Sequence, residues 1–187
     1  KHWYYAGLIN LKTQMTAGYN YPNTTDVISK FLAPGYLLGA VGMDYKPSDQ
    51  FTAFVAPVTA KVTIVNDQTL SDAGAFGVDP GKKSRSEIGG YARFFWKFEV
   101  MKNVTLQTKL DLFSNYLNNP QNIDVSWETL LSMKVNQYIS ATITTHLLYD
   151  DDIAIVVEED AAGNPIKSVK SKVQFKEVLG VGFSYKF

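Results

Sequence analysis

Hydrophobic and polar residues alternate with a period of two along most of the chain, and a helical period is nearly absent. The clearest segment covers residues 85–100, where one set of alternate positions carries five charges and the other set carries none from residue 88 onward. Alternate side chains of a β-strand point to opposite faces of the sheet. The pattern therefore predicts strands with one apolar face and one charged face.

Eight segments show this alternation. It is clear in residues 85–100, 104–116, 123–135, 139–149 and 173–187, and looser in residues 3–14, 36–45 and 51–65. Within 51–65 we expect one apolar face formed by Phe54, Ala56, Val58, Ala60, Val62 and Ile64. Pro57 interrupts this segment and indicates a bulge or bend, because proline cannot donate to a sheet ladder.

The connections between the segments alternate in length. Short turns are expected at residues 46–49, 101–103 and 136–137, and longer loops at 18–35, 66–84, 118–122 and 150–172. Residues 25–32 could form one or two helical turns, and residues 150–172 are expected to continue the last hairpin. Short turns at one end and long loops at the other are typical of outer-membrane barrels.

These patterns predict an all-β fold, a transmembrane antiparallel up-and-down β-barrel with about eight strands in this chain. Its apolar face carries aromatic residues suited to a membrane interface: Trp3, Tyr5, Tyr45, Trp96, Trp127 and Tyr149. The expected strands also exceed the roughly five or six residues usual in soluble proteins. A soluble lipocalin-type barrel, with the apolar face inward, is the alternative.

The charged face predicts a barrel lumen lined by Lys61, Arg85, Glu87, Arg93, Lys97, Glu99, Lys109, Asp111, Glu128 and Lys134. In a narrow barrel these charges neutralise one another and plug the interior. In a wider barrel they line an aqueous path and bias its selectivity. The sequence leaves both interpretations open.

Composition narrows the function classes. The chain has 18 basic and 18 acidic residues, so no nucleic-acid partner is indicated. The absence of cysteine removes disulfides, thiolate metal sites and cysteine nucleophiles. Acidic residues at 150–152 and 158–160 could hold Ca²⁺, but their spacing favours a solvated rim, and neither a metal nor a cofactor is expected.

An enzyme is the weaker hypothesis. His146 shares the polar face with Ser126, Ser132, Ser140 and Asn115, and outer-membrane phospholipases use a Ser-His-Asn set. No strained turn or glycine-flanked serine marks a nucleophile. We therefore expect a polar wall and assign no catalytic residue.

The C-terminal segment, residues 179–187 (LGVGFSYKF), resembles the terminal aromatic signature of outer-membrane proteins. The resemblance implies that Phe183, Tyr185 and Phe187 are read by the barrel-insertion machinery. Further stretches carry a second resemblance: residues 3–5 (WYY) leading to 10–14 (NLKTQ), 31–36 (FLAPGY), 42–47 (GMDYKP), 72–78 (DAGAFGV) and 173–180 (VQFKEVLG). Through these stretches the chain resembles a family of uncharacterised Bacteroidota outer-membrane proteins.

This family resemblance implies a location in the bacterial outer membrane. It also implies that the single domain, residues 1–187, is N-terminally incomplete and belongs to a barrel of about twelve strands. The expected function is non-enzymatic, as a small porin-like channel or as the membrane component of a multi-protein assembly. The expected partners are the lipid bilayer, the insertion machinery and assembly proteins. The alternatives are a phospholipase- or protease-type outer-membrane enzyme and a soluble ligand-binding barrel.

Overall fold

The computed structural model describes residues 2–150, 155–159, 165–169 and 173–185, and it is all-β, with 65% strand and 5% helix. One antiparallel sheet of eight strands has the order β1-β4-β5-β6-β7-β8-β9-β12. Its strands are β1 (Trp3–Thr13), β4 (Gly35–Tyr45), β5 (Phe51–Ile64), β6 (Ser84–Met101), β7 (Val104–Asn115), β8 (Ile123–Lys134), β9 (Ile139–Tyr149) and β12 (Gln174–Phe183). The predicted number of strands and their antiparallel order are confirmed.

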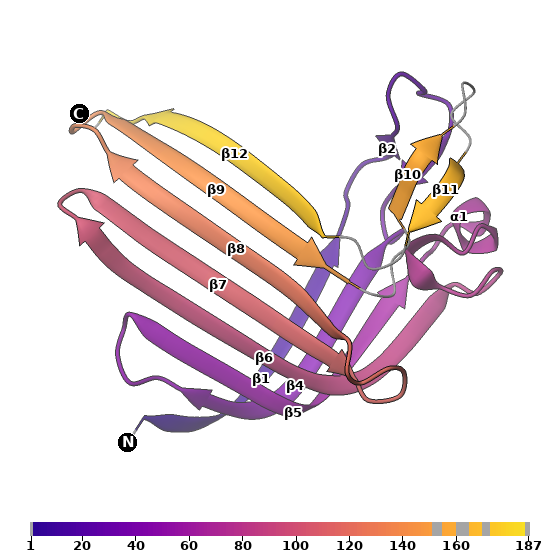
Figure 1. Cartoon of the computed structure of the whole chain (residues 1–187), viewed down its shortest axis with the longest axis horizontal. Coiled ribbons are helices and arrows are strands. Elements are labelled where there is room, and N and C mark those ends of the chain that lie inside the picture. Colours follow the sequence, from indigo (N-terminus) through magenta and orange to yellow (C-terminus); the bar gives the residue numbers. More distant parts are fainter. Residues whose placement is uncertain (1, 151–154, 160–164, 170–172, 186–187) are drawn as a thin grey trace.

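Short and long connections lie at opposite ends of the sheet. The turns at residues 46–50, 102–103 and 135–138 share one end with both termini, which we call the turn end (Figure 1). The other end, the loop end, carries the remaining elements. These are β2 (Gly18–Tyr19) paired with β3 (Val27–Ser29), α1 (Gln68–Asp72), η1 (Ala75–Gly77), and β10 (Ile155–Glu159) paired with β11 (Pro165–Val169). The predicted asymmetry of the connections is therefore present.

The predicted closed barrel is not observed. Within the described residues, β1 and β12 are the two edges of the sheet, and each pairs with a strand on one side only. Figure 1 shows the sheet curving into a trough whose edge strands diverge toward the turn end.

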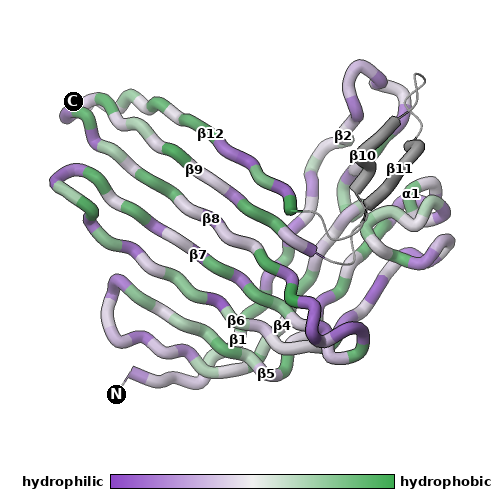
Figure 2. Tube along the Cα trace, viewed as in Figure 1, coloured by the Kyte–Doolittle hydropathy of each residue, from purple (hydrophilic) through white to green (hydrophobic). Residues whose placement is uncertain are grey.

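The two faces of the sheet differ in polarity, as the alternation along the strands in Figure 2 illustrates. Lys61 on β5 pairs with Asp124 on β8, which lies three strands away, so the charged face is the inside of the curve. The outer, convex face is mostly apolar, and Glu177 on β12 is a charged residue on it. One of its rows crosses five strands through Phe94, Leu110, Trp127, Leu147 and Phe175.

A β-bulge at residues 56–59 changes the predicted faces of β5. The register shifts between Ala56 and Thr59 against β6, and between Val41 and Met43 on β4, so the alternation reverses there. Phe54 and Ala56 therefore lie on the concave face, where they are buried, while Val58 is exposed on the convex face. The prediction that these three residues share one face was wrong, although Pro57 had indicated a bulge.

The bulge residues contribute to a small core on the concave face. Ala40, Phe54, Ala56, Tyr91 and Phe113 are buried together, and Ala6, Leu8 and Leu38 pack against them. This core fills the bottom of the trough between β1 and β7.

A second, smaller core lies at the loop end, where Ala33, Val65 and Val78 are buried together. Asp67 caps α1 by accepting from the backbone N–H of Leu70, and its carboxylate pairs with Lys30. The hydrogen bond from Lys30, followed by that from Leu70, lowers the pKa of Asp67 below its ordinary value. The helical turns predicted for residues 25–32 are absent from this described segment, which forms β3 instead. Neither α1 nor η1, the helical segments of the described ranges, is long and apolar enough to cross a membrane.

We expect Gly42→Ala to lower the free energy of unfolding by about 1–3 kcal/mol, because overpacking forces backbone shifts. A Cβ atom at Gly42 would lie 2.1 Å from the Val55 carbonyl oxygen and 2.6 Å from Ala56 Cα, beside the bulge. Gly39→Ala on the same strand is the control, because its Cβ meets nothing within 4 Å. Urea unfolding in detergent, followed by tryptophan fluorescence, measures both. Equal effects of the two substitutions would show that the bulge does not hold this strand closely.

Candidate functional site

The loop end of the concave face carries a network of ion pairs centred on Lys61. Its ammonium lies 2.8 Å from Asp124, 3.5 Å from Asp150 and 3.7 Å from Glu87, and it sits 5.0 Å from the centre of the Phe113 ring. These partners come from β6, β7, β8 and the residue after β9, so one lysine on β5 joins both walls of the trough.

Glu87 is the most buried charge of this network, with 2% of its side chain exposed. Arg85 lies 2.8 Å from its Oε2 atom, and the Asn115 amide donates to its Oε1 atom at 3.2 Å. The Arg85 guanidinium also donates to the Gly77 carbonyl at 3.2 Å, which ties the network to the loop containing α1 and η1. The carboxylate is thus fully surrounded by donors, as a buried charge requires.

A second network crosses the middle of the sheet. Arg93 lies 2.6 Å from Asp111, which also accepts from the Tyr91 hydroxyl. Lys109 lies 3.7 Å from Asp111 and 2.9 Å from Glu128. Opposite charges therefore alternate across β6, β7 and β8.

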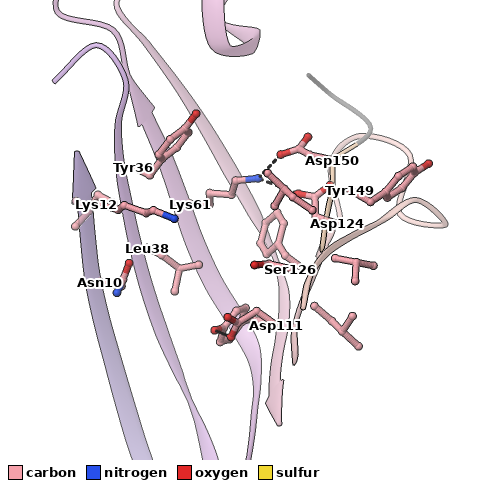
Figure 3. Close-up of a pocket in the computed structure, with 16 residues that line it drawn as sticks. Asn10, Lys12, Tyr36, Leu38, Lys61, Asp111, Asp124, Ser126, Tyr149 and Asp150 are labelled. Carbon is pink, nitrogen blue, oxygen red and sulfur yellow. Dashed lines mark hydrogen bonds and ion pairs between the residues drawn. The ribbon is translucent and has the colours of Figure 1, made fainter. Parts of the chain in front are cut away.

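A pocket of about 260 Å³ lies between the two walls at the loop end (Figure 3). Asn10, Lys12, Tyr36, Leu38, Asp111 and Phe113 line it from the wall formed by β1 to β7, and Asp124, Ser126 and Leu148 from the wall formed by β8, β9 and β12. Lys61 and Asp150 lie at its upper boundary in Figure 3. The pocket thus combines aromatic and apolar surface with charges that are already paired, apart from Lys12, which forms no ion pair within the described residues.

The structure brings together seven of the ten residues predicted to line a lumen: Lys61, Arg85, Glu87, Arg93, Lys109, Asp111 and Glu128. Lys97, Glu99 and Lys134 lie near the turn end instead, and within the described residues they form no ion pair. Sequence reasoning missed Asp124 and Asp150 as partners of Lys61. Asp124 alternates onto the charged face, so the pattern could have identified it, whereas Asp150 falls at the start of a loop.

The predicted interface aromatics lie toward the ends of the convex face, except Trp127. At the turn end the rings of Trp3 and Tyr45 are 4.7 Å apart, and Tyr138 stacks on Phe183 and Tyr185. Trp96 contacts Phe51, the first residue of β5, and Tyr149 ends β9 at the loop end. Tyr5 is 94% exposed. Phe187, the last residue of the expected insertion signal, lies outside the described residues.

Ser126 and His146 form the closest approach to catalytic chemistry. The Ser126 hydroxyl lies 2.9 Å from His146 Nε2, and Glu128 lies 4.0 Å from that same nitrogen. A catalytic histidine is oriented through its other nitrogen, and it needs oxyanion donors nearby. Among the described residues nothing bonds to that other nitrogen of His146, and no group of three or more histidine, aspartate or glutamate side chains is arranged to hold a metal ion. The acidic stretches at 151–152 and 158–160 have no described side chains, so the predicted acidic rim, and the calcium site that was its alternative, lie outside the described part.

We expect Lys61→Met to lower the free energy of unfolding by about 3–5 kcal/mol, the usual effect of removing one partner from a buried ion pair. Methionine keeps most of the side-chain volume, but it leaves the carboxylates of Glu87, Asp124 and Asp150 without their shared cation. Lys82→Met is the control, because Lys82 and Asp79 form a largely exposed pair. Chemical unfolding in detergent measures both variants. A Lys61→Met variant as stable as the control would show that the network contributes little.

Comparison of the chain with protein-family models, curated proteins and solved structures gives no match in any of the three.

Proposed function

We propose that this chain forms part of the wall of an outer-membrane β-barrel, which contains about twelve strands when complete and acts as a small, non-enzymatic channel. The observation that carries the proposal is the inverted polarity of the curved sheet. Its concave face holds the buried charges, while apolar side chains on its convex face are exposed. A soluble barrel needs the opposite arrangement, because its apolar side chains must leave water.

The convex surface supports contact with lipid along its whole width. Ile9 on β1 is 84% exposed, Val58 on β5 is 66% exposed, and Val181 on β12 is 75% exposed. Aromatic rings gather toward the turn end of this surface, at the level where a barrel meets the membrane–water interface. The strands of 10 to 18 residues in the main sheet match or exceed the roughly 9–11 that a tilted membrane strand needs.

The channel part of the proposal rests on the difference between the two walls. The wall from β1 to β7 carries the apolar core, but small polar residues line the surface between β8 and β12, among them Ser132, Ser140 and Thr142. Gly180 and Gly182 on β12 add no side chain there. Such a surface leaves room for water beside the ion-pair networks. A fully plugged interior would instead suit the membrane component of an assembly.

Tryptophan fluorescence tests the membrane part of the proposal, because the chain's three tryptophans, Trp3, Trp96 and Trp127, all lie on the convex face. They are 56%, 51% and 49% exposed. We expect brominated lipids to quench the fluorescence of these tryptophans strongly in reconstituted vesicles.

Two single-tryptophan variants sharpen this measurement. Both carry phenylalanine at positions 3 and 127. One keeps Trp96, and the other combines Phe95→Trp with Trp96→Phe, which moves the indole to the concave face. Brominated lipid should quench the first more than the second. Equal quenching, or quenching only by aqueous iodide, would refute a lipid-facing convex surface.

Planar-bilayer conductance tests the channel part. We expect steady ohmic steps, and Lys97→Glu should change their ion selectivity, because Lys97 lies on the concave face without an ion pair in the described chain. Lys102→Glu makes the same charge change in the turn after β6 and should have a smaller effect. A protein that inserts but does not conduct would replace the channel with the assembly role.

A hydrolase is the second candidate, and the 2.9 Å contact between Ser126 and His146 favours it. We expect no hydrolysis of p-nitrophenyl butyrate above the rate of the Ser126→Ala variant, because the described residues supply no group that orients His146 through its other nitrogen. Turnover that Ser126→Ala abolishes would establish an enzyme.

A further inference from the structure

The two edge strands leave matching surfaces uncovered. β1 and β12 each expose one side of their backbone, within the sheet that the structure describes. Their outward side chains are also exposed, with Ile9 at 84% and Leu11 at 61% on β1, and Leu179 at 72% and Val181 at 75% on β12. An uncovered strand edge is a template for another strand.

Toward the loop end and the middle of the concave face, cations pair with carboxylates across neighbouring strands, whereas Lys97 and Lys134 nearer the turn end have no ion pair in the described chain. Lys61 lies directly opposite Glu87 on the next strand, Arg93 opposite Asp111, and Lys109 opposite Glu128. Their closest N–O distances are 3.7, 2.6 and 2.9 Å. Each of these three cations therefore has a carboxylate at the same level on a neighbouring strand.

The edge strands carry cations on the same face that lack such a partner. Lys12 on β1 lies opposite Tyr36, and Lys176 on β12 lies opposite His146. Neither lysine forms an ion pair within the described residues, and both are exposed. The strands β4 and β9, which pair with β1 and β12, therefore supply no carboxylate to these lysines. The other side of each edge strand is the uncovered one, from which a carboxylate would have to come.

Pairing of β1 with β12 would not give either lysine a carboxylate partner. Lys12 is near the loop end of β1 and Lys176 near the loop end of β12, so a register that aligns these ends brings two ammonium groups together. Like charges on adjacent strands destabilise the pairing. The same repulsion arises when β1 of one copy pairs with β12 of a second copy. Pairing of β1 with β1 of a second copy would invert one copy relative to the membrane.

We propose that each edge of the sheet pairs with an acidic amphipathic β-strand that is not among the strands of this sheet, and that this strand presents a carboxylate to the concave face beside Lys12 or Lys176. Its outward positions are apolar and continue the convex surface of β1 and β12. The proposal rests on the proposed function in that such strands complete the wall of the barrel. It adds the charge that they must carry and their position in the register.

Two synthetic ten-residue peptides test this chemistry. Both alternate apolar and polar residues, and they differ at one central polar position, which is Glu in one and Lys in the other. Fluorescence anisotropy measures their binding to the full chain folded in detergent micelles. We expect the Glu peptide to bind about tenfold more tightly, since attractive and repulsive cross-strand charge pairs each shift the free energy by up to about 1 kcal/mol.

The double variant Lys12→Glu, Lys176→Glu should reverse this preference. The double variant Lys97→Glu, Lys134→Glu is the control, because it makes the same change in net charge on the concave face away from the edges and should keep the preference. Equal binding of the two peptides overturns the proposal, as does a preference that survives the first double variant.

Disulfide trapping tests the competing arrangement directly, because the natural chain contains no cysteine. Asn10→Cys and Val178→Cys place thiols on the concave side of the two edges, directly opposite each other in the register that aligns Lys12 with Lys176. We expect no disulfide between them. A disulfide within one chain or between two copies would show that β1 and β12 pair with each other, and would overturn the proposal. Both experiments use micelles, so failure of membrane insertion leaves their outcome readable and is detected separately by the brominated-lipid measurement.

Discussion

The carboxylate of Glu87 imposes the strongest constraint on this structure. With 2% of its side chain exposed, it can stay ionised only if protein groups replace its water, because an unpaired buried charge costs several kcal/mol. Arg85, Asn115 and Lys61 supply those groups. Lys61 then carries the constraint further, because it also meets Asp124 and Asp150 on the other wall. The curvature of the sheet and the pairing of its charges therefore depend on each other.

The bulge at residues 56–59 supplies the other half of that curvature. A bulge bends its strand and increases the local twist. Here it turns Phe54 and Ala56 inward, where they pack with Tyr91 and Phe113 below the Lys61 network. Close contact at Gly42 leaves no space for a side chain at this bend. The bend thus produces one wall with an aromatic core, whereas the wall formed by β8, β9 and β12 keeps regular alternation and has small inward residues toward its turn end.

Strand positions were predictable from the sequence because the period-two signal is local and repeated. The same signal predicted the charged residues of the concave face, among them Arg93 and Asp111, which lie opposite each other on neighbouring strands. The period-two signal gave wrong or incomplete predictions where the position of a side chain depends on the register of a bulge or on contacts between distant strands. Pro57 indicated a bulge but not its register, so Phe54 was assigned to the wrong face. The pairing of Lys61 with Asp124 joins residues three strands apart, and only the curvature of the sheet brings them together. The helix was predicted in the wrong loop, at residues 25–32 and not at 68–72. Residues able to cap a helix occur in both loops (Thr25 and Asp26 in the first, Asp67 in the second), but Asp67 also forms an ion pair with Lys30.

The polar atoms of the convex face give an independent view of what that face contacts. Thr108, Thr129 and Thr145 are in register across β7, β8 and β9, and Glu177 on β12 continues this polar row within the apolar surface. The Trp127 indole donates to the Thr108 hydroxyl at 2.7 Å, and that hydroxyl lies 3.4 Å from the hydroxyl of Thr129. A side chain facing water has no need of such partners, because water satisfies it. A surface facing hydrocarbon must pair its polar groups internally. The bonding of Trp127, Thr108 and Thr129 to one another therefore agrees with a lipid-facing convex surface at this place, and it does so without reference to the charges on the other side of the sheet.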